Sequence, residues 1–172
     1  LTVTINAAKS TMPTSSATPI SVLTREILQY ATNIEEAYAI ASQRKTFVAE
    51  SILVGSAKDG KAAIIEKSPD KIALFTGNGD TQLICTNHYQ SDIFNQDERH
   101  LENMETSDSP YRFARLTELL ERNNPIDYTK AAAILRDHKG LKDTEIGIPN
   151  EMAINQFIAH HSVIFKPEQR IM

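Results

Sequence analysis

Residues 47–86 decide the fold, and their sequence is FVAESILVGSAKDGKAAIIEKSPDKIALFTGNGDTQLICT. Apolar and β-branched runs alternate here with clusters of turn-forming residues, which is the pattern of strands separated by tight turns. The turns are expected at Ser68-Pro69-Asp70 and at Gly77-Asn78-Gly79-Asp80. We predict an antiparallel meander, covered on both faces, with strands over 47–54, 62–67, 71–76 and 81–86.

The residues before the meander predict one strand and two helices. Apolar and polar residues alternate strictly over 1–6, which is the period of a half-buried strand. Thr18-Pro19 offers an N-cap and a first-turn proline for one helix. Asn33, followed three residues later by Glu36, resembles a capping box that opens the second helix.

The residues after the meander predict a long loop, two helices and a strand. Residues 88–108 are polar and without a pattern, which is typical of a functional loop. Helices are expected to begin at Asp108-Ser109-Pro110 and at Asp127, the second ending near Gly140, and a strand is expected over 155–165. This order of elements predicts an α+β layered fold.

Composition excludes several classes of protein. The chain has 22 acidic and 18 basic residues, so it lacks the excess of positive charge typical of nucleic-acid binders. No apolar run approaches the roughly 20 residues that span a bilayer, so no membrane span is expected. Cys85 is the single cysteine, which excludes an intramolecular disulfide and leaves the localisation undecided.

At both ends of the sequence, an expected strand is cut short. Leu1 opens directly into a strand pattern, and a turn at 166–169 is followed by only three more residues. We therefore expect residues 1–172 to form a single incomplete domain that lacks an upstream part and downstream strands, the alternative being short terminal edge strands. Exposed strand edges would favour association with the missing part or between copies as a homo-oligomer.

Candidate nucleophiles and metal ligands are few. Cys85 lies in an apolar strand pattern, where burial raises a thiol pKa and makes it inert, although His88 three residues on could form a thiol pair with it. His160 and His161 are adjacent in an expected strand, so their side chains point to opposite faces, and no metal-binding spacing occurs. We predict no metal site and no cofactor.

Two asparagines stand at strand ends. Asn6 closes the polar face of the first strand, and Asn87 directly follows the strand expected at 81–86. A fixed side-chain amide can donate an N–H to a substrate oxygen that gains charge, which is the function of an oxyanion hole. Turn chemistry is the alternative, because asparagine also favours strand ends for its own backbone bonding.

Four short sequence motifs, taken in order, resemble those of a known family. They are Leu1-Thr2-Val3-Thr4-Ile5-Asn6-Ala7, Ile84-Cys85-Thr86-Asn87-His88-Tyr89, Ser109-Pro110-Tyr111-Arg112-Phe113-Ala114-Arg115-Leu116 and His161-Ser162-Val163-Ile164-Phe165. Together they are similar to N-terminal-nucleophile (Ntn) hydrolases of the penicillin acyltransferase branch, which is related to choloylglycine hydrolases and acid ceramidase-like amidases. The resemblance covers nearly the whole chain.

The resemblance implies a fold and a mechanism. The fold would be part of a four-layer αββα sandwich with mainly antiparallel sheets. An N-terminal cysteine, exposed by autocatalytic cleavage, would attack a linear amide of a small-molecule substrate, with acyl-coenzyme A as a further candidate substrate. By motif, Asn6 and Asn87 would be the oxyanion and orienting residues, and His88 and Tyr89 would lie on the substrate side.

The chain departs from this pattern at the nucleophile. Leu1 cannot attack, Cys85 is not where the family keeps its cysteine, and Thr2, if exposed by trimming, would sit in mid-strand. We therefore expect the nucleophile in the missing N-terminal part, and an inactive chain as it stands. A non-catalytic ligand-binding relative and a Cys85–His88 thiol enzyme are the alternatives.

Overall fold

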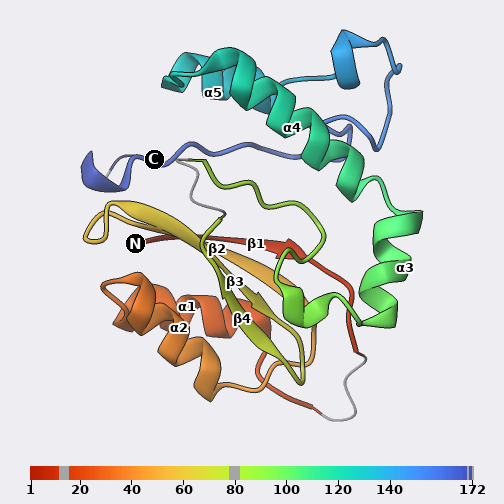
Figure 1. Cartoon of the computed structure of the whole chain (residues 1–172). Helices are drawn as coiled ribbons and strands as arrows, with labels where there is room; N and C mark the ends of the chain where they lie inside the picture. The colour runs from red at the N-terminus through yellow and green to blue at the C-terminus, as the bar shows by residue number, and fades with distance from the viewer. Residues whose placement is uncertain (12–15, 78–81, 170, 172) are drawn as a thin grey trace.

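The computed structural model describes residues 1–11, 16–77, 82–169 and 171, and its centre is one antiparallel sheet (Figure 1). The strands follow the sheet in chain order: β1 (Thr2–Ala7), β2 (Glu50–Ser56), β3 (Lys61–Lys67) and β4 (Ile72–Phe75). The predicted meander is thus confirmed for three strands, with β1 added at its edge. The turn at residues 68–70 is confirmed as well, since the Ser68 N–H bonds the Lys71 carbonyl at 2.9 Å.

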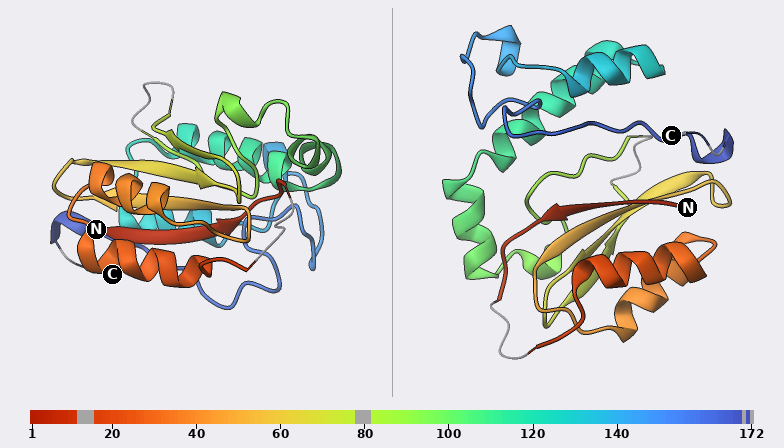
Figure 2. Two further views of the ribbon diagram at one scale, coloured as in Figure 1. Left: turned by 90° about the horizontal axis from the view of Figure 1, so that it is seen from below. Right: turned by 180° about the vertical axis from the view of Figure 1, so that it is seen from behind.

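Two helices, α1 (Ile20–Tyr30) and α2 (Ile34–Gln43), cover one face of this sheet (Figures 1 and 2). The core between them is fully buried and consists of Leu23, Ile27, Ala37, Ala41, Ile52, Val54, Ala63 and Ile65. Burying each large apolar side chain contributes about 1.5–3 kcal/mol, so this layer holds the sheet and the helices together. Asn33 caps α2 as expected, accepting the Glu36 N–H at 2.8 Å, whereas Pro19 rather than Thr18 precedes α1.

The opposite face of the sheet is more polar. Pairing aligns Asn6 with Ser51, and Ser51 with Glu66, so these three side chains form a row across β1, β2 and β3. Residues 82–87 and 160–166 run over this face, with α4 (Ser109–Asn123) and α5 (Tyr128–Leu135) beyond them (Figures 1 and 2). The polar row therefore faces the interior of the molecule.

Several sequence predictions were wrong or went untested, among them the end of the last helix, since α5 ends at Leu135 and not near Gly140. Residues 82–86 and 155–165 form no strands, because no neighbouring strand pairs with them among the described residues. The expected loop at 88–108 contains a 3-10 turn, η1 (Asp92–Phe94), and the helix α3 (Glu98–Thr106), which Asp97 caps by accepting the His100 N–H. The expected turn at 77–80 has residues 78–80 outside the described part.

Arg115 ties α4 to the chain that follows α5. Its side chain is 1% exposed and bonds Asp137 twice, at 2.9 and 3.0 Å. It also contacts Asp143, in the 3-10 turn η2 (Leu141–Asp143), and Glu118 on its own helix. A last turn, η3 (Pro167–Gln169), lies where a turn was expected. None of the helices formed by the described residues is long and apolar enough to cross a membrane.

Candidate active site

Two crossing hydrogen bonds join the segments that carry Asn6 and Asn87. The Asn6 Nδ2 donates to the Cys85 carbonyl at 3.2 Å, and the Asn87 Nδ2 donates to the Ala7 carbonyl at 2.9 Å. The end of β1 and residues 85–87 are thus held together by the two amides. Each amide nitrogen carries two hydrogens, so each keeps a second N–H that these bonds do not use.

Asn87 is fixed by three further bonds, one to α3 and two to α4. Its backbone N–H donates to the Ser109 Oγ at 2.7 Å, at the start of α4. Its carbonyl accepts the Asn103 Nδ2 of α3 at 2.7 Å, and its Oδ1 accepts the Arg112 Nη2 of α4 at 2.9 Å. Because the Arg112 guanidinium can only donate, the Oδ1 must face it, and the Nδ2 must face β1. The amide orientation is therefore determined.

His88 and Tyr89 are buried beneath this arrangement. The His88 Nδ1 lies 2.8 Å from the Ser109 Oγ and 3.1 Å from the Thr86 Oγ1. Burial first, and then the charges of His100 and Arg112, lower the pKa of His88 to about 4, so the ring is neutral at pH 7. The Tyr89 hydroxyl donates to the Lys67 carbonyl at 2.6 Å. Both side chains support the segment from inside, and their role in substrate binding stays a prediction.

Residues 1–152 match the family model described as acyl-coenzyme A:6-aminopenicillanic acid acyl-transferase (AAT). The chain belongs to this family. The acyl-transferase family is Ntn-hydrolase-like, and membership suggests acyl-transferase or amidase-type activity. Neither the curated proteins nor the solved structures gave a significant match.

Cys85 is a poor nucleophile for an acyl-transferase. Burial first, and then repulsion from the nearby Glu66 carboxylate, raise the pKa of the Cys85 thiol to about 12. Its Sγ lies 3.8 Å from the Thr86 carbonyl, and the His88 Nδ1 is occupied by the two hydroxyls. This environment opposes a Cys85–His88 thiol enzyme and agrees with the structural interpretation of Cys85.

Glu66 anchors the segment that carries Asn87 in this member of the acyl-transferase family. Its carboxylate is fully buried and accepts two backbone N–H groups, from Gln90 and Ser91. Burial raises the pKa of Glu66, and the two N–H bonds partly offset that rise. Gln90 and Ser91, which follow Asn87, are therefore hydrogen-bonded to β3, whereas Asn87 itself is hydrogen-bonded to β1.

Sequence reasoning found the two asparagines but not the residues that hold them. Asn87 is stabilised by Asn103, Ser109 and Arg112. Of these, only Ser109 and Arg112 belong to a sequence motif that is similar to the acyl-transferase family. Asn103 had no such signal, because residues 88–108 were expected to be a loop. Within the described residues, no group of three or more His, Cys, Asp or Glu side chains is arranged to hold a metal ion.

Proposed function

We propose that the protein acts on a linear amide bond of a small-molecule substrate, with Asn6 and Asn87 stabilising the charged oxygen of the tetrahedral intermediate. The observation that carries this proposal is the pair of crossing amide bonds, which joins the end of β1 that carries Asn6 to the segment that carries Asn87. Each amide keeps one N–H for a ligand, and preorganised donors of this kind contribute about 3–4 kcal/mol each to the transition state.

The attacking group would be an N-terminal cysteine carried by a part of the protein outside this chain. Its thiol would attack the amide carbonyl while its own α-amino group takes the thiol proton. The amine then leaves with that proton, a thioester remains, and water or a second amine accepts the acyl group. Cys85 supports this proposal indirectly, because its buried, raised-pKa thiol is unsuited to the step. The chain alone would be inactive.

The same missing part would complete the fold. We propose that residues 82–86 and 160–165 belong to a second sheet, which would make the molecule a four-layer αββα sandwich related to choloylglycine hydrolases. Support comes from their position between the β1–β4 sheet and the helices α4 and α5 (Figure 1). Acyl-coenzyme A as the acyl donor and a homo-oligomer assembled through these edges remain within this proposal.

An aspartate at position 87 tests the proposal in the full-length protein. Asn87→Asp keeps an oxygen for Arg112 but replaces the amide donor by a negative charge. We expect kcat on simple acyl anilides to fall by at least about 10²–10³. Losing the amide bond to the Ala7 carbonyl should also cost about 1–3 kcal/mol of folding free energy, so kcat is measured well below the melting temperature of the variant. Asn95→Ala serves as the control, because Asn95 is exposed and its side chain bonds only Asp92 among the described residues. A kcat within a few-fold of wild type in Asn87→Asp would remove Asn87 from the mechanism.

A further inference from the structure

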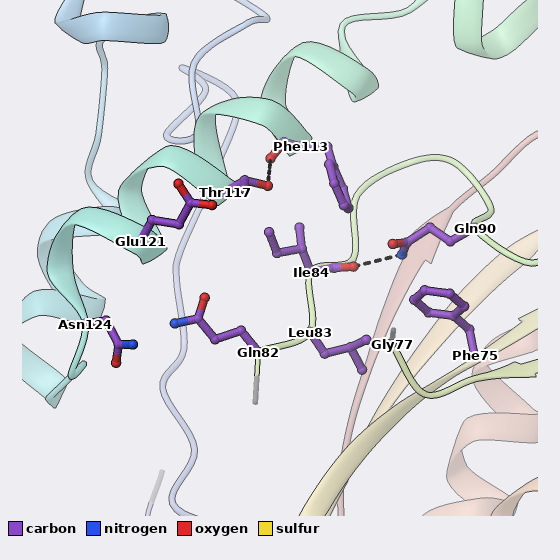
Figure 3. A pocket seen from close by; sticks show the side chains of 10 residues that line it. All are labelled: Phe75, Gly77, Gln82, Leu83, Ile84, Gln90, Phe113, Thr117, Glu121 and Asn124. Atoms are coloured by element: carbon purple, nitrogen blue, oxygen red, sulfur yellow. Dashed lines mark hydrogen bonds between the residues drawn. The ribbon is translucent and has the colours of Figure 1, made fainter. Parts of the chain in front are cut away.

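A cavity of about 440 Å³ lies between α4 and residues 82–84, beside the end of β4 (Figure 3). This volume is in the range of small-molecule binding sites. Its walls come from residues 75–90 and, more than 20 residues further along the chain, from residues 113–124, so the fold assembles it. Neither Asn6 nor Asn87 lines it, and it is therefore a feature separate from the amide pair.

The two ends of the cavity differ in chemistry. One end is lined by Phe75, Leu83, Ile84 and Phe113, all partly exposed to the opening. The other end is lined by Gln82, Glu121 and Asn124 (Figure 3). Phe113 and Glu121 are eight residues apart on α4, which separates the two ends by about 12 Å along the helix. The site is thus long, apolar at one end and polar at the other.

The polar end is not committed to other contacts. Among the described residues, the side chains of Gln82, Glu121 and Asn124 have no hydrogen-bond partner, and Glu121 has no ion-pair partner. Glu121 is also the one charged residue of the described cavity lining. A lone exposed carboxylate on a helix is usually just solvated, but here two free amides face the same space. Together they offer acceptors to an ammonium group.

The apolar end lies beside the asparagines. Phe113 directly follows Arg112, which bonds Asn87, and its ring centre lies 5.4 Å from that of His88. Ile84 directly precedes Cys85, whose carbonyl accepts the Asn6 amide. A ligand whose reacting carbonyl sits at the asparagines would therefore extend its chain along the apolar wall and place its far end at Glu121.

We propose that this cavity binds the acyl part of the substrate and that Glu121 selects acyl chains ending in an ammonium group. The inference rests on the proposed function, since it takes the asparagines as the reacting end. The substrate class is then a linear amide of an ω-amino acid rather than of a plain fatty or aryl acid. Glu121 acts as a specificity-determining residue and takes no part in bond making.

Two ligands with the same carbon chain, long enough to run from the asparagines to Glu121, test this selection by binding alone. The 4-nitroanilides of 10-aminodecanoic acid and of decanoic acid differ only by the terminal ammonium group, and each is titrated into the 172-residue chain by NMR. We expect the ammonium ligand to bind more tightly. Glu121→Gln should weaken binding of the ammonium ligand about two- to fivefold, which is the contribution of an exposed ion pair, and leave binding of the decanoyl ligand unchanged. Adding 1 M salt should remove the preference.

Control variants separate the explanations. Glu105→Gln removes an equally exposed carboxylate on α3 and should change neither affinity. Glu121→Lys should reverse the preference toward a chain ending in a carboxylate. Equal affinity for the two anilides, no effect of Glu121→Gln, or no binding of either ligand overturns the proposal. Because no catalysis is measured, a failure of the Asn87→Asp test would sink the proposed function and leave this binding result intact.

Discussion

Replacing Arg115 by methionine should destabilise the protein strongly, although Arg115 lies outside the candidate site. The side chain is 1% exposed, and its main partner, Asp137, is 13% exposed. Three carboxylates surround the guanidinium, and their hydrogen bonds, led by those to Asp137, raise the pKa of Arg115 well above its usual range. Methionine fills most of the volume but leaves Asp137 without a counter-ion.

The magnitude follows from this burial. Removing one partner of a buried ion pair costs about 3–5 kcal/mol. Asp143 and Glu118 are 46% and 24% exposed and keep Arg122 as a partner, so the low end, about 3 kcal/mol, is expected. For a chain of this size that corresponds to a fall in melting temperature of about 6–12 °C.

Arg122 provides the matched control on the same helix. It contacts the same Glu118 and Asp143 but is 46% exposed, so Arg122→Met should shift the melting temperature by less than about 3 °C. The double variant Arg115→Met with Asp137→Leu should regain part of the loss, because no buried charge is then left alone. Thermal unfolding by circular dichroism measures all three. Equal losses for Arg115→Met and Arg122→Met would refute the reasoning.

Three further outcomes are expected. Glu66→Gln should lower the free energy of unfolding in urea by about 1–3 kcal/mol, since its amide cannot accept both backbone N–H groups, while the exposed Glu102→Gln should not. Cys85 should react with iodoacetamide at neutral pH about 10³-fold more slowly than after unfolding in urea, because its thiol pKa is raised from 9.0 to about 12; rapid labelling of the folded chain would contradict its burial. Stability should decline as pH falls from 6.5 to about 4, since the unfolded chain protonates His88 while the folded chain does not, and His88→Gln should flatten urea midpoints in that window.

The sequence predicted the parts of the fold in which local pattern and tertiary contact agree. Strands β2 and β3 are nearly continuous apolar runs, a pattern that is visible in the sequence, and one face of each strand packs against α1 and α2. Helix α5 was predicted by its cap, and Asp127 accepts the Lys130 N–H at 2.8 Å as expected. Helix α3 was missed because its buried residues, His100 and Asn103, are polar and give no apolar period.

The wrong strands at 82–86 and 155–165 have a different cause. Alternation of apolar residues predicts an extended, half-buried segment, but a strand also needs a neighbour for its backbone groups. Residues 82–86 are half-buried over the sheet, and the bonds they make go to side chains: Asn6 bonds the Cys85 carbonyl, and the Gln90 Nε2 bonds the Ile84 carbonyl at 2.8 Å. The sequence therefore predicts whether a segment is buried better than it predicts whether a neighbouring strand is present to pair with it.

The candidate site shows why turn chemistry does not account for Asn87. An asparagine that serves a turn bonds backbone groups within its own few residues. The side chain of Asn87 instead reaches Ala7 on β1 and Arg112 on α4, and its backbone is held by Ser109 and Asn103. Two of these bonds fix the orientation of the side-chain amide, and the other two hold the backbone of Asn87 in place. Joining residues 85–87 to β1 would not require all four bonds. Preorganisation of this kind is what a donor to a developing oxyanion needs, because a donor that must reorient at the moment of reaction loses much of its stabilising effect.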